Sequence, residues 1–335
     1  FFIFATVISS MDLKSIFNLN SEKKFSDLAI EIFHIQFENN PVYRSFCDLL
    51  NINSSDVQKI EDIPFLPINF FKTHTVKSTK KKIKKTFLSS GTTNKNASKH
   101  YLTNPKIYRK SFRKCFEFFY GPIKDYVILA LLPSYLERNG SSLVYMVNDM
   151  IVRSKKPQSG FYLNNLKELK DTIQELDQSG QKTILIGVSF ALLDLIEFHQ
   201  FNLKNTIIME TGGMKGQRKE LIKSELHEYL KKGFGVQAIH SEYGMTEILS
   251  QAYSKNNGLF KTPPWMKILI RDTEDALSIL PIEKSGGINI IDLANIDSCA
   301  FIATQDLGMI HKNGYFELLG RFDQSEVRGC NLMVV

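Results

Sequence analysis

The sequence lacks the patterns that mark several large classes of protein. Only four of its 335 residues are cysteine, and none lies in a Cys-x-x-Cys pair, which argues against a zinc site. It has no helix-turn-helix, zinc-finger or aromatic RNA-binding signature, so nothing in it indicates a nucleic-acid-binding domain. The Walker pattern, GxxxxGK followed by Ser or Thr, is also missing, which argues against a P-loop nucleotidase.

Long apolar runs are scarce as well. The opening segment, FFIFATVISS, has ten residues, too few to cross a bilayer, and it has no basic flank of the kind that a secretory signal carries. Because the chain begins with Phe, Met11 is a candidate true start and residues 1–10 are candidate upstream read-through. We therefore expect a cytoplasmic protein with reduced thiols and no transmembrane segment.

The composition is that of a globular protein with one unusual segment. Hydrophobic residues make up 43% of the chain and charged residues 23%, and the 25 phenylalanines suit either the core or a channel for an apolar ligand. The formal net charge is +7, and six lysines lie within KSTKKKIKK at 77–85. Such a run can bind nucleic acid or a membrane, but a solvated loop is the commoner outcome.

The first third of the chain has helical spacing and clear helix starts. Apolar residues recur at helical intervals over 22–51, and Asn40-Pro41 is typical of a cap followed by the first residue of a second helix. A proline-broken extended segment over 61–73 follows. Asn104-Pro105 predicts another helix that ends near residue 120.

Strands and helices then alternate, which indicates a parallel sheet covered by helices. We expect strands over 126–132, 183–188, 206–210 and the start of 235–247, with helices over 140–147 and 216–232. Short strands dominate after about residue 266, and Asn313-Gly314 predicts a hairpin between two of them.

Three loops have residues suited to binding a nucleotide. The segment 89–95 offers hydroxyls, backbone N–H groups and a lysine to a polyphosphate. TGGMKG at 211–216 permits close approach of the backbone to a planar base, and SEYGMTE at 241–247 offers an aromatic ring, a hydroxyl and a carboxylate. Taken singly, a Ser/Thr-rich turn, a helix-entry turn and a capped helix start explain them equally well.

Taken together and in order, these loops, TQDLG (304–308) and GRFDQSEVRGC (320–330) resemble the adenylate-forming, or acyl-activating, enzymes. In that superfamily an SSGTTG-type loop lies over the ATP phosphates and a YGxTE motif contacts the nucleotide and the metal. An Asp holds the ribose, and a GRxD segment forms the hinge to a C-terminal domain. The five matches span residues 89–323.

Two departures narrow the resemblance. Asn94 stands where a glycine usually closes the phosphate loop, and the chain ends twelve residues after Asp323, so we expect the usual C-terminal domain to be missing. One similarly short branch is the LuxE-type acyl-protein synthetases, which carry the acyl group on a cysteine near their own C-terminus. Cys330 in VRGCNLMVV, together with TGGMKG, resembles that branch.

The resemblance implies an α/β fold like the N-terminal domain of adenylate-forming enzymes. Mostly parallel sheets would be covered by helices, with a small antiparallel β unit near the C-terminus. We expect an N-terminal helical segment packed on the main domain (1–80), a nucleotide-binding α/β body (81–265), the antiparallel β unit of the same domain (266–318) and a hinge and acyl-carrier tail (319–335).

The resemblance also implies a function, with ATP and Mg²⁺ as cofactors. A fatty acid, expected to be long-chain, would become acyl-AMP and then pass to the Cys330 thiol and on to a protein partner, an acyl-CoA-reductase-type or carrier protein. Two alternatives remain: transfer to CoA or a carrier-protein thiol, as in phenylacetate–CoA ligases, and a non-catalytic relative that binds an acyl nucleotide. No nucleic-acid partner is expected.

Each matching residue receives a role from the resemblance. Catalytic roles fall to Cys330, Thr246, Glu247 and Arg321, and Glu247 is also the metal ligand. His240 and Glu242 are candidate bases, whereas His100 stands in no constellation, and Cys47, Cys115 and Cys299 are expected to be inert. Nucleotide-binding roles fall to Ser89, Ser90, Gly91, Thr92, Thr93 and Lys95 at the phosphates, to Gly212, Gly213, Tyr243 and Gly244 at the base, and to Asp306 at the ribose.

Overall fold

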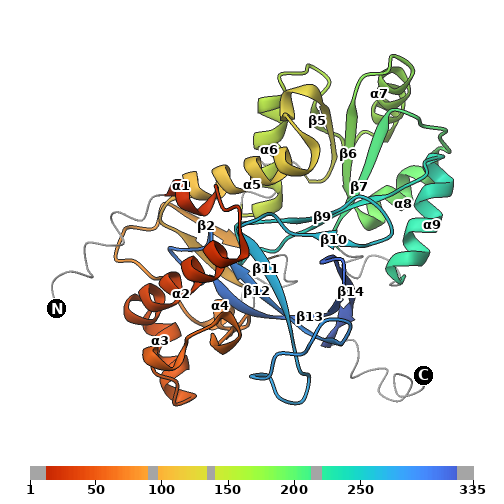
Figure 1. Cartoon of the computed structure of the whole chain (residues 1–335). Helices are drawn as coiled ribbons and strands as arrows, with labels where there is room; N and C mark the ends of the chain where they lie inside the picture. Colours follow the sequence, from red (N-terminus) through yellow and green to blue (C-terminus); the bar gives the residue numbers. More distant parts are fainter. Residues whose placement is uncertain (1–12, 90–96, 134–139, 213–220, 323–335) are drawn as a thin grey trace. The chain divides into compact units, whose positions relative to one another are not determined.

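The computed structural model describes residues 13–89, 97–133, 140–212 and 221–322 (Figure 1). The chain divides into two compact units. The first takes the described parts of 1–111, 246–250 and 262–335, and the second takes those of 112–245 and 251–261. The chain therefore passes from the second unit into the first between Met245 and Thr246, inside the YGMTE motif.

The first unit begins with helices whose ends are set by polar caps. The Ser21 hydroxyl accepts from Lys24 N at the start of α2 (Glu22–Asn39). Asn40 Oδ1 accepts from the backbone N–H groups of Val42 and Tyr43, so α3 (Pro41–Leu49) starts at its proline. The flanking short elements are α1 (Leu13–Ile16), 3₁₀ turns at Ser54–Asp56 and Ile60–Asp62, and α4 (Phe70–Thr73).

An antiparallel sheet completes the first unit. Its strand order is β11 (Met266–Arg271), β12 (Ser285–Asp292), β13 (Phe301–Ile310) and β14 (Phe316–Arg321), and β1 (Leu66–Pro67) pairs with β13 in parallel. A separate antiparallel hairpin joins β2 (Lys85–Leu88) to β3 (Lys99–Leu102). Tyr43 of α3 stacks on Phe301 of β13, with ring centroids 6.1 Å apart, so helices and sheet share one core.

The second unit is built on a mainly parallel sheet. Its strand order is β10 (Phe260–Lys261), β9 (Ala252–Ser254), β8 (His240–Tyr243), β7 (Thr206–Thr211), β6 (Thr183–Val188), β4 (Val127–Leu131) and β5 (Gly160–Phe161). The run from β8 to β5 is parallel, whereas β9 and β10 are antiparallel. Strands β4 and β6 are buried throughout, which explains their continuous apolar sequences.

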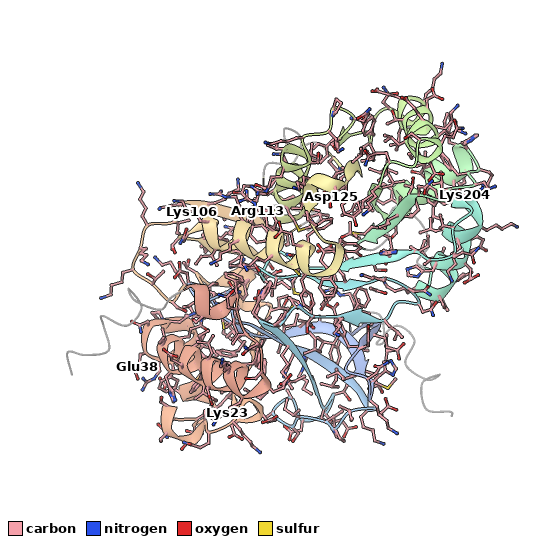
Figure 2. All side chains as sticks on the ribbon, turned by 45° about the horizontal axis from the view of Figure 1, so that its top comes forward. Lys23, Glu38, Lys106, Arg113, Asp125 and Lys204 are labelled. Carbon is pink, nitrogen blue, oxygen red and sulfur yellow. The ribbon has the colours of Figure 1, made fainter. Side chains whose placement is uncertain are left out.

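Helices flank this parallel sheet, as Figure 1 shows. They are α6 (Ser142–Ser154), α7 (Leu166–Gln178), α8 (Ser189–Phe198) and α9 (Lys223–Phe234). Helix α5 (Pro105–Tyr120) starts in the first unit and ends in the second. Figure 2 labels Lys106 and Arg113 on α5, and the Arg113 guanidinium binds the Asp149 carboxylate of α6 with Nε 2.8 Å from Oδ2. No helix among the described residues is both long and apolar enough to span a membrane.

Most elements expected from the sequence are confirmed. The parallel strands, the helix start at Asn40-Pro41 and the hairpin at Asn313-Gly314 are present, and Gly314 has a φ of +77°. The expectation of one strand leading from residue 235 was too long, because only His240–Tyr243 is extended. The β2–β3 hairpin and strands β9 and β10 were not expected at all. The proposed segment boundaries at 80, 265 and 318 stay a prediction.

Candidate functional site

The segment that follows the YGMT motif is fixed in the first unit by a buried carboxylate. Asp292, at the end of β12, accepts hydrogen bonds from the backbone N–H groups of Leu249 (2.7 Å) and Ser250 (3.0 Å) and from the Ser250 hydroxyl (2.6 Å). Its side chain also accepts from Ala294 N at 3.1 Å. Because these bonds hold residues 249–250 to the sheet, they also fix the position of Glu247 two residues earlier.

A histidine and an asparagine hold the backbone carbonyl groups of Thr246 and Glu247. His100 of β3 is fully buried, with Nδ1 2.8 Å from the Thr246 carbonyl oxygen and Nε2 3.0 Å from Asn295 Oδ1. Asn295 Nδ2 donates to the carbonyl oxygens of Glu247 (2.8 Å) and Cys299 (2.7 Å). Burial lowers the pKa of His100 to about 4, although both hydrogen bonds act in the opposite direction.

The sequence placed His100 in no catalytic constellation and did not predict the positioning contacts that the structure gives it. The residue holds the backbone of Thr246 through a contact 146 positions away in the chain. The only local signal was a histidine shortly after the Ser- and Thr-rich segment 89–95, which we call the hydroxylated loop. Long-range pairing of this kind is not encoded in sequence spacing.

The carboxylate of Glu247 is buried within the first unit and lies beside the base of the hydroxylated loop. Glu247 is 4% exposed, and the nearby Ser98 hydroxyl lowers the pKa of its carboxyl. Ser89 and Ser98 are paired, because Ser89 N donates to Ser98 O (3.1 Å) and Ser98 N donates to Ser89 Oγ (2.9 Å). The Ser89–Ser98 pair thus lies beside Glu247.

Two charges modify Glu247. Burial raises its pKa and the Asp306 carboxylate raises it too, whereas the Ser98 hydroxyl and the Lys72 ammonium act in the opposite direction. Two carboxylates in one neighbourhood repel each other unless a cation lies close. Both Asp306 and Lys72 therefore influence whether the Glu247 carboxyl is ionised.

Asp306 lies in β13 directly opposite Arg321 of β14. Arg321 Nε is 3.7 Å from Asp306 Oδ1, and Arg321 Nη2 donates to Gln305 Oε1 at 3.1 Å. The Arg321 side chain is half exposed, so this is a weak surface pair rather than a fixed clamp. Separating Arg321 from Asp306 would therefore cost little energy.

A buried arginine lies behind Asp306. Arg271 of β11 donates from Nη1 to the Ile288 carbonyl oxygen (2.8 Å) and Asn289 Oδ1 (2.9 Å), and from Nη2 to Thr304 O (2.6 Å). Burial lowers its pKa, and the Asp306 charge opposes this shift. A Cβ atom at Gly287 would lie 2.5 Å from Arg271 Cζ, so the guanidinium needs a glycine there.

The second unit holds the base-binding candidates. Gly212 follows β7 directly and has a φ of +67°, a left-handed conformation that favours glycine, and its carbonyl oxygen accepts from Ser189 Oγ at 3.0 Å. The Tyr243 ring is buried with its centroid 6.0 Å from that of Phe260. Gly244 is exposed, and a Cβ there would lie 2.5 Å from Glu242 Oε1.

A charged cluster that sequence reasoning missed lies at the same ends of β7 and β8. Glu210 is buried and forms an ion pair with Lys223 of α9, and His227 Nε2 is 3.4 Å from Glu210 Oε1. Burial acts to raise the pKa of Glu210, but Lys223, His227 and Ser241 outweigh it and bring the pKa to about 2. We assign the cluster a structural role, since it joins α9 to the sheet.

The other reactive candidates have ordinary roles. Burial raises the pKa values of the Cys47 and Cys299 thiols to about 12, so both are inert as nucleophiles, and Cys115 is buried with Sγ donating to Gln251 O. His240 Nδ1 is 3.0 Å from the Tyr120 hydroxyl, and Glu242 accepts from Thr211 Oγ1. Seven predicted site residues lie outside the described residues: Ser90, Gly91, Thr92, Thr93, Lys95, Gly213 and Cys330.

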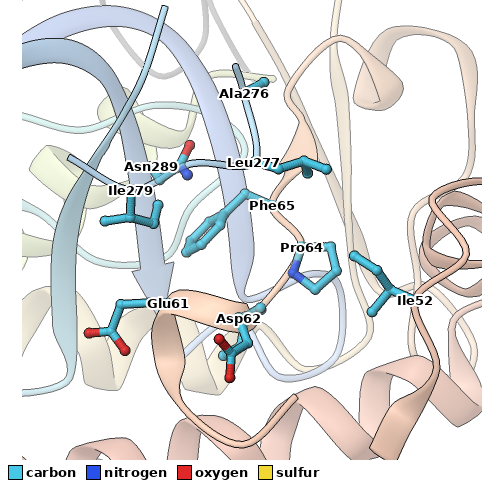
Figure 3. Close-up of a pocket in the computed structure, with 10 residues that line it drawn as sticks. Ile52, Glu61, Asp62, Pro64, Phe65, Ala276, Leu277, Ile279 and Asn289 are labelled. Carbon is cyan, nitrogen blue, oxygen red and sulfur yellow. The ribbon is translucent and has the colours of Figure 1, made fainter. Parts of the chain in front are cut away.

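A cavity of about 200 Å³ lies elsewhere in the first unit (Figure 3). Its walls come from residues 61–65, from the 276–279 turn and from Ile52 and Asn289. None of the predicted site residues lines it. The Asn289 Nδ2 atom is buried without a hydrogen-bond partner among the described residues, which fits a small polar guest such as water.

Residues 141–335 match the family described as "Acyl-protein synthetase, LuxE", which is more than half of the chain. The chain belongs to the LuxE acyl-protein synthetase family. Among curated proteins, no sequence matches this LuxE family member.

Solved structures place the fold of this LuxE family member among adenylate-forming enzymes. ATP-bound MatB from Rhodopseudomonas palustris has a TM-score of 0.54 and 18% identity, and the match covers 70% of this chain and 47% of that one. An open conformation of 2-hydroxyisobutyryl-CoA ligase, in complex with 2-HIB-AMP and CoA, has a TM-score of 0.68 and 13% identity, with coverage of 90% and 70%. The LuxE family chain thus spans about half the length of MatB, and at these identities the likeness concerns the fold.

Proposed function

We propose that this chain uses ATP to activate a fatty acid as acyl-AMP and then carries the acyl group on the thiol of Cys330. The observation that supports the proposal most strongly is the buried Glu247 carboxylate, whose pKa is lowered by Ser98 and raised by the charge of Asp306. Glu247 and Asp306 both lie within the stretch that matches the LuxE family. Membership of that family supports acyl activation in general, and the fatty acid and the cysteine are our own assignments.

The first step makes a poor electrophile reactive. A carboxylate oxygen of the acid attacks the α-phosphorus of ATP, the bond from that phosphorus to the bridging oxygen breaks, and pyrophosphate leaves with the electron pair. Two anions must approach each other, so the step needs fixed positive charge and hydrogen-bond donors. We assign Ser89, Ser90, Gly91, Thr92, Thr93 and Lys95 to the β- and γ-phosphates.

The remaining nucleotide contacts follow the same logic. Thr246 is assigned to the α-phosphate, and its carbonyl is held by His100. Asp306 is assigned to the ribose hydroxyls, with Arg321 beside it. The adenine base is assigned to Gly212, Gly213, Tyr243 and Gly244.

We assign a magnesium ion to Glu247. Among the described residues no group of three or more His, Cys, Asp or Glu side chains is suited to hold a metal. Mg²⁺ usually binds one or two carboxylates together with substrate phosphates, and the buried Glu247 near Asp306 offers that donor set. When bound there, Mg²⁺ would neutralise charge on the phosphates.

The second step transfers the acyl group. The thiolate of Cys330 attacks the acyl carbon, the C–O bond to AMP breaks, and AMP leaves as its phosphate anion. Arg328 lies two residues before Cys330 in the sequence, and its charge would favour the thiolate. A protein with its own nucleophile, an acyl-CoA-reductase-type or carrier protein, is the proposed final acceptor.

Intact-mass measurement after incubation with ATP, Mg²⁺ and tetradecanoic acid tests this proposal. We expect a hydroxylamine-labile acyl adduct on the wild type and none on Cys330→Ser, with Cys47→Ser as the matched control that keeps the adduct. An adduct on Cys330→Ser would refute the nucleophile assignment. Acyl-AMP that turns over only after CoA is added would favour the CoA-ligase alternative, and no pyrophosphate release with any acid would favour the non-catalytic one.

A further inference from the structure

The basic character of the chain is concentrated in one segment. Residues 63–116 contain twelve lysines and two arginines, and no aspartate or glutamate. The whole chain has 42 Lys and Arg against 35 Asp and Glu, so the remainder has 28 basic residues against 35 acidic ones and a net charge of −7. The overall charge of +7 therefore arises entirely from this 54-residue stretch.

The structure exposes these lysines around the β2–β3 hairpin of the first unit. The hairpin continues directly from the lysine-rich segment 77–85. Lys84 N donates to Leu102 O, and Lys85 lies opposite Leu102. In Figure 2, nitrogen-tipped side chains project outward on the side of the labelled Lys106. We call the exposed set the lysine face: Lys80, Lys81, Lys82, Lys84, Lys99 and Lys106.

The charges of the lysine face are not balanced by carboxylates of the described residues. None of its six ammonium groups forms an ion pair with a carboxylate of the described residues, whereas lysines elsewhere, such as Lys223 and Lys267, do. Six like charges on one face repel each other, so this arrangement is electrostatically unfavourable in the isolated protein. An anionic surface would relieve that repulsion.

The residue types indicate which kind of anionic surface fits. Protein interfaces favour arginine and aromatic residues and are depleted in lysine, but the lysine face contains no arginine. Single-stranded nucleic acids need exposed aromatic rings for stacking, and in this hairpin Phe87 and His100 are buried and Tyr101 is half-buried. Clustered lysines with an exposed apolar neighbour suit an anionic bilayer, and Leu88 beside Lys99 is 40% exposed.

We propose that the lysine face docks the protein on an anionic lipid surface. The inference depends only on charge and exposure and is independent of the proposed acyl activation. Each lysine near an anionic lipid surface adds to the free energy of binding. Removing three lysines should therefore weaken binding by about 100-fold. It also weakens as salt shortens the screening length.

Vesicle co-sedimentation tests the proposal. The full-length protein is mixed with vesicles of phosphatidylcholine and phosphatidylserine, or of phosphatidylcholine alone, at low and high salt. The test variant is Lys81→Gln/Lys82→Gln/Lys84→Gln. The matched control, Lys167→Gln/Lys204→Gln/Lys232→Gln, removes the same charge from exposed lysines of the second unit. Melting curves check that both variants fold.

We expect the wild type and the control to sediment with the anionic vesicles at low salt and to leave them at high salt. The test variant should lose binding by about 100-fold. Equal loss in the control, or no binding of the wild type to anionic vesicles, would overturn the proposal. So would tighter binding to polyglutamate or to single-stranded RNA than to the vesicles, which would assign the face to an acidic protein or to nucleic acid.

Discussion

The Ser98 hydroxyl lowers the pKa of the Glu247 carboxyl, so two residues that are 149 positions apart in the chain lie close together. Ser98 is also paired through its backbone with Ser89 at the other end of the hydroxylated loop. Ser89, the described part of the segment that the proposal assigns to phosphates, is therefore linked through Ser98 to the carboxylate that it assigns to the metal.

Replacing Ser98 with Ala should shift the acid limb of the activity profile to higher pH. The hydroxyl holds the pKa of Glu247 down, so its loss leaves burial and Asp306 to raise that pKa further. We expect pyrophosphate release to fall about 3- to 10-fold near neutral pH, as loss of one hydrogen bond predicts. The measurement is the rate against pH for Ser98→Ala and for the exposed control Ser55→Ala, and superimposable profiles would refute the connection.

His100 should make the protein less stable in acid. Burial lowers its folded-state pKa to about 4, below the ordinary value near 6.5, so the unfolded chain binds the proton more tightly. Its contribution is present above pH 6.5 and is lost as the pH falls from 6.5 towards 4, by about 3 kcal/mol in total. The free energy of unfolding, measured with urea at several pH values, should depend less on pH between 6.5 and 4 in His100→Gln than in the wild type. An unchanged slope would mean that His100 titrates normally.

Asp292→Asn should destabilise the first unit strongly. The carboxylate accepts from three backbone N–H groups and one hydroxyl, and an amide would turn a donor towards some of them. We expect the free energy of unfolding to fall by about 2–4 kcal/mol. Asp275→Asn, at an exposed position, is the matched control and should cost far less. Equal effects in the two variants would contradict the role of Asp292.

Gly287→Ala should displace the Arg271 guanidinium. The new Cβ would lie 2.5 Å from Arg271 Cζ. Because the guanidinium is buried and donates three hydrogen bonds, moving it should destabilise the protein by about 1–3 kcal/mol. Gly160→Ala is the control, because its nearest neighbour would be 3.5 Å away. Thermal unfolding of both variants provides the comparison, and a Gly287→Ala protein as stable as the control would show that the guanidinium moves freely.

Local signals made much of the fold predictable. Asn40-Pro41 and Asn313-Gly314 encode a helix start and a hairpin through backbone preferences of the residues themselves, and β4 and β6 are apolar throughout because both faces are buried. The hairpin β2–β3 was missed because its strands are short and flank a loop rich in hydroxyls. Its pairing is not apparent from hydrophobic alternation.

The candidate site was predictable only in part, for a different reason. Glu247 and Asp306 were identified by motif, because each lies in a short recognisable stretch, SEYGMTE and TQDLG respectively. The residues that position Glu247 and its neighbours, His100, Ser98 and Asp292, act through contacts with segments far away in the chain. A serine, a histidine or an aspartate with such a role looks ordinary in the sequence, and only the packed structure distinguishes it.

Pyrophosphate release from ATP, Mg²⁺ and tetradecanoic acid by Glu247→Ala tests the central claim most directly. The claim is that the buried Glu247 carboxylate serves acyl-adenylate formation. Glu274→Ala, at an exposed carboxylate of the same unit, is the control, and melting curves establish that both variants fold. We predict that Glu247→Ala loses at least about 100-fold in rate, as expected for a lost electrostatic contact, while the control keeps the wild-type rate. A folded Glu247→Ala protein that releases pyrophosphate as fast as the wild type would contradict the account.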